Sequence, residues 1–456
     1  MINQVSKNAG LDITKNADVK VTKNAGVLLK KNAGLRVTKN AGVLGIDFGT
    51  SNSAIAWAPQ AGIVTPLAVE GTATAMPTAL FFDAEENRVQ FGRAAVANYL
   101  SGTDGRLMRS LKSLLGSSLL DESTEIFGRS TRFSDIIGFY LAELKARAEQ
   151  STGAKINTVW IGRPVHFVDD DPEKDAKAQN SLQAAAESVG FKNVHFQFEP
   201  IAAAIDFESR LTSEATVLIA DIGGGTSDFS VLRLGPDRQH EADRSSDVLA
   251  TAGVHIAGTD FDTSISLETV MPLLGYRHVG LRGREVPRSV FHDLSTWHRI
   301  HFAQTLKSIN AVRMLDDTYS DLVMYQRLLK VLKDRLGHHI AADVEQCKIA
   351  SSSSGGEPIY AQLDYIEAHL RVAMQEDQIV ELLRKHLDGI TQCAKDCVKR
   401  SGLKANELTH IYLTGGSSAL TAFQRALKKT FPNAQLIEGD LFGGVAAGLA
   451  RQGSRS

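Results

Sequence analysis

Two segments of the sequence share one unusual pattern: an apolar strand that ends in an aspartate, a glycine turn with hydroxyl side chains, and a second apolar strand. The first copy occupies residues 43–57 and contains Asp47, and the second occupies residues 217–234 and contains Asp221. Apolar runs on both sides of a short glycine turn predict a β-hairpin. Two such hairpins, about 170 residues apart, predict a duplicated domain in which each copy contributes one hairpin.

The residue types in these turns suit phosphate binding. Glycine lets backbone N–H groups approach phosphate oxygens closely because it has no Cβ. Thr50, Ser51 and Thr226 add hydroxyl donors. Asp47 and Asp221 stand at strand ends, where a carboxylate can hold the waters of a Mg²⁺ ion that is bound to the phosphates.

Other glycine motifs do not fit the two segments. A dinucleotide-binding turn opens a helix, whereas each turn here is followed by a strand. The sequence contains no G-x-x-x-x-G-K-[ST] phosphate loop. A third glycine turn, at residues 415–417, follows an apolar strand and precedes a helix that begins near Leu420. That turn suits an adenosine group and an α-phosphate, because free N–H groups at a helix start attract anions.

An eight-residue repeat that opens with Lys-Asn-Ala occupies the start of the chain. Residues 1–42 carry eight basic and two acidic side chains, although the whole chain of 456 residues has a net charge of −2. With few large apolar side chains, the repeat cannot offset the entropy of ordering, so we predict a disordered extension and a folded protein that begins near Val43. The remainder is acidic and gives no support for nucleic-acid binding.

Cysteine content and hydropathy limit the cellular setting. The three cysteines are too few for a disulfide framework, which fits a reducing compartment. No apolar run approaches the roughly 18 residues that would span a bilayer, and no secretion signal opens the chain. We expect a cytoplasmic monomer that does not bind a membrane.

Six segments together resemble the ATPase domain of the DnaK-type heat-shock chaperones, in the order in which that family has them. They are the two hairpins, Phe198-Glu199-Pro200, residues 255–262, the pair Glu345 and Lys348, and residues 413–417. The resemblance implies an α/β, two-lobed actin-like ATPase fold of duplicated ribonuclease H-like domains with a cleft. It places the lobes at 43–215 and 216–456, with an expanded small subdomain at about 262–345. Residues 159–167 and 271–275 resemble a YegD-like branch of the family.

The resemblance also implies a role for each matching residue. ATP or ADP would be bound by Gly49, Thr50, Ser51, Asn52, Gly223, Gly224, Gly225, Thr226 and Gly258, with the adenosine held by Glu345, Lys348, Gly415, Gly416 and Ser417. Asp47 and Asp221 would hold Mg²⁺ through its waters. The catalytic group would be Asp221, Asp228, Glu199 and Thr226, acting mainly by positioning and charge stabilisation.

Two departures from the family pattern bear on activity. Val96 stands where the family alignment places a catalytic lysine, and Arg93, Arg109 or Lys112 are the candidates to replace it. The sequence ends soon after Arg451, where the family continues into a peptide-binding domain and a lid, so we expect a protein that lacks them.

These features lead to one main hypothesis and three alternatives. The main one is a chaperone-like ATPase that hydrolyses ATP slowly and has unidentified protein clients or regulators. The alternatives are a nucleotide-dependent binding module with little turnover, a small-molecule kinase of the same fold, and a filament-forming protein. Histidines between residues 262 and 345 are expected to be surface or capping residues, since no closed set of metal ligands is apparent.

Overall fold

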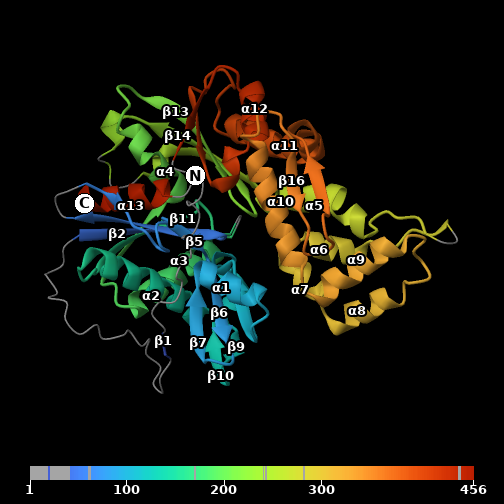
Figure 1. Cartoon of the computed structure of the whole chain (residues 1–456). Coiled ribbons are helices and arrows are strands. Elements are labelled where there is room, and N and C mark those ends of the chain that lie inside the picture. Colours follow the sequence, from blue (N-terminus) through green and yellow to red (C-terminus); the bar gives the residue numbers. More distant parts are fainter. Residues whose placement is uncertain are drawn as a thin grey trace, which may run out of the picture.

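The structure, a computed structural model, describes residues 19–20, 42–59, 63–168, 171–239, 241, 244–280, 283–439 and 443–455. Two β-sheets form the centres of two lobes (Figure 1). We call residues 42–214 the first lobe and residues 215–439 the second lobe. The predicted extension at 1–42 lies outside the described residues except for β1 (Val19–Lys20) and Gly42, and the predicted domain boundaries remain predictions.

The first lobe is built on a mixed sheet in the order β12-β11-β2-β3-β4, with β5 also paired to β3. Its strands are β2 (Gly42–Phe48), β3 (Asn52–Pro59), β4 (Thr65–Pro66), β5 (Ala75–Pro77), β11 (Thr158–Arg163) and β12 (Asn193–Phe198). Helices α2 (Phe133–Thr152) and α3 (Pro172–Ser188) pack on this sheet, because Ile46, Tyr140 and Leu182 are buried in one apolar cluster.

A smaller antiparallel sheet, β1-β7-β6-β8, completes the first lobe. Its strands are β6 (Ala79–Asp83), β7 (Arg88–Phe91) and β8 (Gly105–Arg109), and helix α1 (Gly92–Leu100) packs against it. Two 3₁₀ turns, η1 (Leu111–Leu114) and η2 (Ser118–Asp121), follow β8, and the hairpin of β9 (Ser123–Ile126) and β10 (Arg129–Arg132) comes next. Lys112 lies in η1, and its Nζ contacts Glu199, which directly follows β12 of the large sheet.

The second lobe repeats the plan of the first. Its sheet has the order β15-β14-β13-β18-β19, and the strands are β13 (Ala215–Ile222), β14 (Ser227–Leu234), β15 (Val248–Val254), β18 (His410–Thr414) and β19 (Gln435–Glu438). In both lobes the first hairpin strand is antiparallel to the second and parallel to a later strand, β11 in one and β18 in the other. This equivalence is what a duplicated domain predicts. Helices α11 (Glu376–Arg400) and α12 (Thr421–Thr430) pack on this sheet. Phe229 of β14, Leu387 of α11 and Phe423 of α12 are buried in one apolar cluster.

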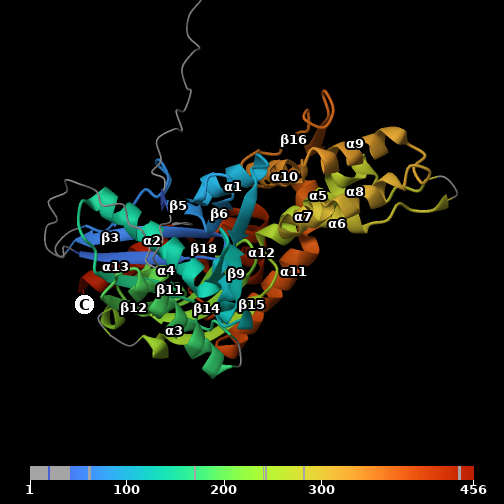
Figure 2. The ribbon, with the colours of Figure 1, turned by 90° about the horizontal axis from the view of Figure 1, so that it is seen from below.

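A helical segment extends from the second lobe, away from both sheets (Figures 1 and 2). It contains α5 (Gly258–Thr269), α6 (Ser289–Ser295), α7 (Ile300–Ala303), α8 (Leu306–Arg313), α9 (Leu322–Lys333) and α10 (Gly337–Ser351), with the 3₁₀ turns η5 (Met271–Leu274) and η7 (Trp297–Arg299). The two-stranded sheet of β16 (Ile359–Gln362) and β17 (Arg371–Met374) follows α10. In the described residues, no helix combines the length and apolar character that a membrane crossing requires.

Two helices bring the lobes together. Helix α4 (Glu199–Glu208) and the C-terminal helix α13 (Gly444–Arg455) pack on each other, and α13 also lies on β2 and β3. Glycine permits this closeness, since a Cβ at Gly448 would collide with the carbonyl oxygen of Ala202 and one at Gly45 with that of Ala446. The packing fixes both hairpins relative to α4, which begins at Glu199.

Candidate functional site

Both predicted hairpins are present, and both end in the predicted glycine turns. Asp47 lies opposite Ala54 in the pairing of β2 with β3, and Asp221 lies opposite Asp228 in the pairing of β13 with β14. The second turn is closed by the Gly223 N–H, which donates to the carbonyl oxygen of Thr226 at 3.0 Å. Each turn therefore follows a strand that delivers an aspartate directly beneath it.

The two turns face each other across the lobes. A Cβ placed on Gly224 would lie only 2.5 Å from Oγ of Ser51, so the tip of one turn is in contact with the other. Thr50 and Gly225, next to this contact, are exposed. Backbone N–H groups from both turns can therefore bind the same anionic group from opposite sides.

Thr78 supports the first turn, and the sequence motifs did not indicate it. Its Oγ1 donates to the carbonyl oxygen of Gly49 at 2.8 Å, and its N–H donates to the carbonyl oxygen of Ser51 at 2.9 Å. Its hydroxyl is also 2.8 Å from Oγ of Ser53. The turn that carries Thr50 is thus held by a residue outside the hairpin.

Carboxylates from both hairpins gather beneath the turns with Glu199 of α4. Burial and the nearby charge of Glu199 raise the pKa of Asp47 to about 8. Burial and the adjacent Asp228 raise the pKa of Asp221 to about 7. Burial also raises the pKa of Asp228, against the hydrogen bond that Oγ1 of Thr226 donates to its Oδ2 at 2.8 Å. Such a group of like charges is stabilised by any cation that binds among them.

Lys112 is the basic side chain that the structure places in this group. Its Nζ lies 2.5 Å from Oε1 of Glu199, and although burial alone would lower its pKa, the carboxylates of Glu199 and Asp47 raise it overall. Of the other candidates for the family lysine, Arg93 pairs with Glu70 at 2.6 Å. Val96 packs against the apolar cluster that contains Phe81.

The carboxylates fit a Mg²⁺ ion that is held through water. No three His, Cys, Asp or Glu side chains in the described part of the chain lie close enough to enclose a metal ion. Mg²⁺ keeps several waters and takes few protein ligands when phosphate is present. Asp47 and Asp221 stand beneath opposite turns, so they fit the outer-shell role that the sequence predicts for them.

The third glycine turn meets the second one. Oγ of Ser417 donates to the carbonyl oxygen of Gly223 at 2.9 Å, and the Gly258 N–H donates to the same oxygen at 3.2 Å. Nζ of Lys348 lies 2.8 Å from Oδ1 of Asp262 and donates to the carbonyl oxygen of Gly258 at 3.3 Å. A Cβ at Gly258 would collide with Oγ of Ser417, which explains the glycine there.

The remaining predicted residues lie around these contacts. Gly415 has a φ of +78°, and a Cβ on it would collide with Oδ1 of Asp221. Glu345 lies one helical turn before Lys348 on α10. Asn52, Gly416 and Glu345 are exposed. The structure thus brings the predicted phosphate, metal and adenosine residues to one region between the lobes.

Comparison with known proteins agrees with this arrangement. A family model described as "Hsp70 protein" matches residues 122–271 and 326–454, more than half of the chain. The chaperone protein DnaK of Thermosipho melanesiensis is 26% identical over 392 residues, and that of Thermotoga neapolitana is 26% identical over 391 residues. Each alignment covers 85% of this chain and 55% of the relative, so the chain spans about half the length of these curated relatives.

These matches confirm the predicted family and the two-lobed actin-like ATPase fold, while the YegD-like branch stays a prediction. The hairpins, the acidic group beneath them and the family match all support one assignment: the chain belongs to the Hsp70 family.

Proposed function

We propose that this protein binds ATP or ADP with Mg²⁺ between its lobes and hydrolyses ATP slowly in a chaperone-like cycle. The observation that carries the proposal is the contact between Ser51 and Gly224. This contact brings backbone N–H groups of both turns close together, directly above the carboxylates of Asp47, Asp221 and Glu199. We further propose a cytoplasmic monomer that contacts protein clients or regulators, and neither nucleic acid nor membrane.

In this proposal the chain's own residues promote phosphoryl transfer by holding the phosphates and the attacking water in position. The N–H groups of the turns hold the β- and γ-phosphate oxygens, while Lys112 supplies positive charge. Bound Mg²⁺ would neutralise phosphate charge. Asp221 and Asp228, paired across the hairpin, can orient the attacking water and accept its proton, and Thr226 fixes the Asp228 carboxylate.

The test is a calorimetric titration of the full chain with ATP, with and without Mg²⁺, followed by phosphate release from the same sample. We expect Mg²⁺-dependent binding and phosphate release above the background of an Asp221→Asn variant. Binding without phosphate release would support the nucleotide-dependent binding module instead. Absence of ATP binding would refute both.

A further inference from the structure

One strand of the smaller sheet in the first lobe comes from the N-terminal repeat. Strand β1 pairs antiparallel with β7, with Val19 opposite Val89 and Lys20 opposite Arg88. Figure 1 shows β1 beside β7, on the side away from β6. Among the described strands, only β1 and β6 pair with β7. The outer edge of β7 therefore has a partner where the repeat supplies one.

An uncovered strand edge presents a row of unpaired N–H and C=O groups, and another extended segment can pair with them. Strand β7 holds such a row in a fixed position. Its residues alternate, so that Val89 and Phe91 are buried while Arg88 and Gln90 are partly exposed. Both buried side chains belong to the apolar core of the lobe. The edge of β7 is thus a firm template for an added strand.

Charge favours the basic repeat at this edge over the opposite one. The turn that joins β6 to β7 carries three carboxylates and one guanidinium: Asp83, Glu85, Glu86 and Arg88. Arg88, which lies opposite Lys20, is paired with Asp83 at 3.4 Å. Residues 1–42 carry eight basic and two acidic side chains, so they are attracted to this acidic turn. Strand β8, at the other edge of the sheet, carries Arg106 and Arg109 and repels them.

One position of the eight-residue repeat lies in a strand at two places in the structure. Val19, in β1, is the fifth residue of the unit that begins at Lys15, and Val43, in β2, is the fifth residue of the unit that begins at Lys39. The fifth residues of the other units are also apolar: Leu11, Val27 and Leu35. In each of the first four units the seventh residue is apolar too, and residues two apart share one face of a strand.

The repeat needs an existing edge because it has few large side chains with which to build a core. Strand β7 supplies the hydrogen-bond partners instead. The segment between Lys20 and Gly42 can extend to about 70 Å, more than the roughly 40 Å width of a domain as large as this lobe. A unit one repeat away changes that connection by eight residues, which alters the free energy of loop closure only slightly.

We propose that the outer edge of β7 is a strand-addition site, occupied by one unit at a time of this chain's own N-terminal repeat, and that the units are interchangeable in it. The docked unit covers an edge that would otherwise be open to pairing with another chain. This inference goes beyond the proposed function and is independent of it, because it involves neither the nucleotide nor the glycine turns.

The test is hydrogen exchange of the full chain, read by mass spectrometry in peptides that contain β7 or β8. The four-unit variant replaces the fifth and sixth residues of the first four units with proline, which has no N–H to donate to β7. We expect exchange at β7 to become about tenfold faster, as for the loss of one or two hydrogen bonds. Exchange at β8, the other edge of the same sheet, should stay as in the unmodified protein.

Two further variants separate the parts of the inference. Val19→Pro with Lys20→Pro alters only the unit that forms β1. Exchange at β7 should then stay within about twofold of the unmodified protein, because another unit takes its place. The matched control has prolines at the second and third residues of the same four units, such as Asn16→Pro with Ala17→Pro, outside the paired positions. It should exchange at β7 as the unmodified protein does.

Each contrary result overturns the inference. Unchanged exchange at β7 in the four-unit variant would show that the repeat does not cover this edge. Equal acceleration in the Val19→Pro, Lys20→Pro variant would show that the units are not interchangeable. Protection at β7 that rises with protein concentration, together with a dimer in sedimentation, would identify a second copy as the occupant. Equal acceleration at β7 and β8 would mean that the whole sheet had loosened.

Discussion

The guanidinium carbon of Arg109, in the first lobe, lies 4.6 Å from the centre of the Trp297 ring in the second lobe. The ring of His338 also lies 4.4 Å from the Trp297 ring, and His338 in turn lies 5.1 Å from the ring of Tyr99 of the first lobe. These four side chains, which we call the interlobe bridge, connect α1 and β8 to η7 and α10. Glu345 lies within electrostatic reach of Arg109, so the bridge is close to the predicted adenosine residues.

Removing the centre of the bridge should speed nucleotide release. Trp297→Ala loses the contacts of both Arg109 and His338, and a cation–π contact of this kind is worth about 1–2 kcal/mol. We expect release of a fluorescent ADP analogue to accelerate about tenfold in stopped-flow measurements. Tyr360→Ala is the matched control, because Arg371 lies over that ring at 4.8 Å within the second lobe alone. Equal release rates in the two variants would show that the bridge does not restrain lobe opening.

His338 should make stability sensitive to acid. Burial, followed by the charges of Arg109, His301 and His339, lowers the pKa of His338 to about 4 from an ordinary 6.5. Tyr99 packs on its ring, and neither ring nitrogen has a hydrogen-bond partner in the described residues. Because the unfolded chain binds this proton more readily, the stability contribution is present above pH 6.5 and is lost as pH falls toward 4.

The measurement compares the free energy of unfolding of the unmodified protein and of His338→Phe at pH 7 and pH 5. Relative to the variant, which keeps an aromatic ring but cannot titrate, the unmodified protein should lose about 2 kcal/mol over that interval. The comparison cancels the titration of carboxylates common to both proteins. Parallel pH profiles would exclude His338 as the cause.

Lys112 should be needed for turnover more than for binding. Its ammonium lies among Glu199, Asp47 and Asp221, under the turns, and loss of one preorganised charge costs about a hundredfold or more in turnover. Lys112→Ala should therefore nearly abolish phosphate release while calorimetry still detects ATP. Arg93→Ala, which removes only distant contacts, with Glu70 and with the carbonyl oxygen of Ala75, should behave as the unmodified protein. If Lys112→Ala retains full turnover, another group supplies the charge.

The sequence predicted what is local to each motif. The hairpins, Asp47 and Asp221 follow from patterns within a few residues, because strand period and glycine turns are set by neighbours in the chain. Which basic side chain enters the site was not predictable in this way. Lys112 reaches Glu199 across 87 residues of sequence, and no local pattern distinguishes it from Arg93 or Arg109.

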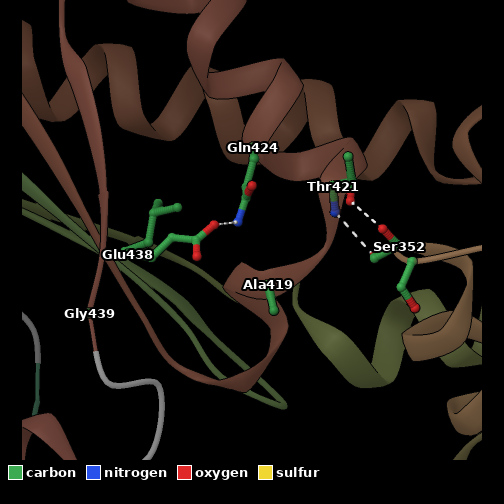
Figure 3. Close-up of a pocket in the computed structure, with 8 residues that line it drawn as sticks. Ser352, Ala419, Thr421, Gln424, Glu438 and Gly439 are labelled. Atoms are coloured by element: carbon green, nitrogen blue, oxygen red, sulfur yellow. Dashed lines mark hydrogen bonds between the residues drawn. The ribbon is translucent and has the colours of Figure 1, made fainter. Parts of the chain in front are cut away.

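The other unpredicted contacts are also long-range. Thr78 supports Gly49 from 29 residues away, and an isolated threonine carries no motif. Arg109 and Trp297 meet only because the lobes are closed on each other. Gln424 and Glu438 become a pair because α12 and β19 flank one cavity (Figure 3). Sequence reasoning thus found the residues that are predicted to bind phosphate and missed those that contact them from distant parts of the chain.

Close contact between the turns that carry Ser51 and Gly224 should be needed for tight binding of ATP. Gly224→Ala places a methyl group 2.5 Å from Oγ of Ser51, closer than van der Waals contact allows, so the Ser51 side chain or its turn must shift and ATP should bind about tenfold or more weakly. Gly225→Ala is the comparison, since a Cβ there meets nothing within 4 Å and its effect should be smaller. Ser51→Gly removes the opposing hydroxyl. If the collision is the cause, Gly224→Ala should therefore weaken ATP binding less in the Ser51→Gly protein than in the unmodified protein. Calorimetric titration of the unmodified protein, Gly224→Ala, Ser51→Gly and their combination forms a double-mutant cycle, and strictly additive losses would mean that the two turns do not meet in solution.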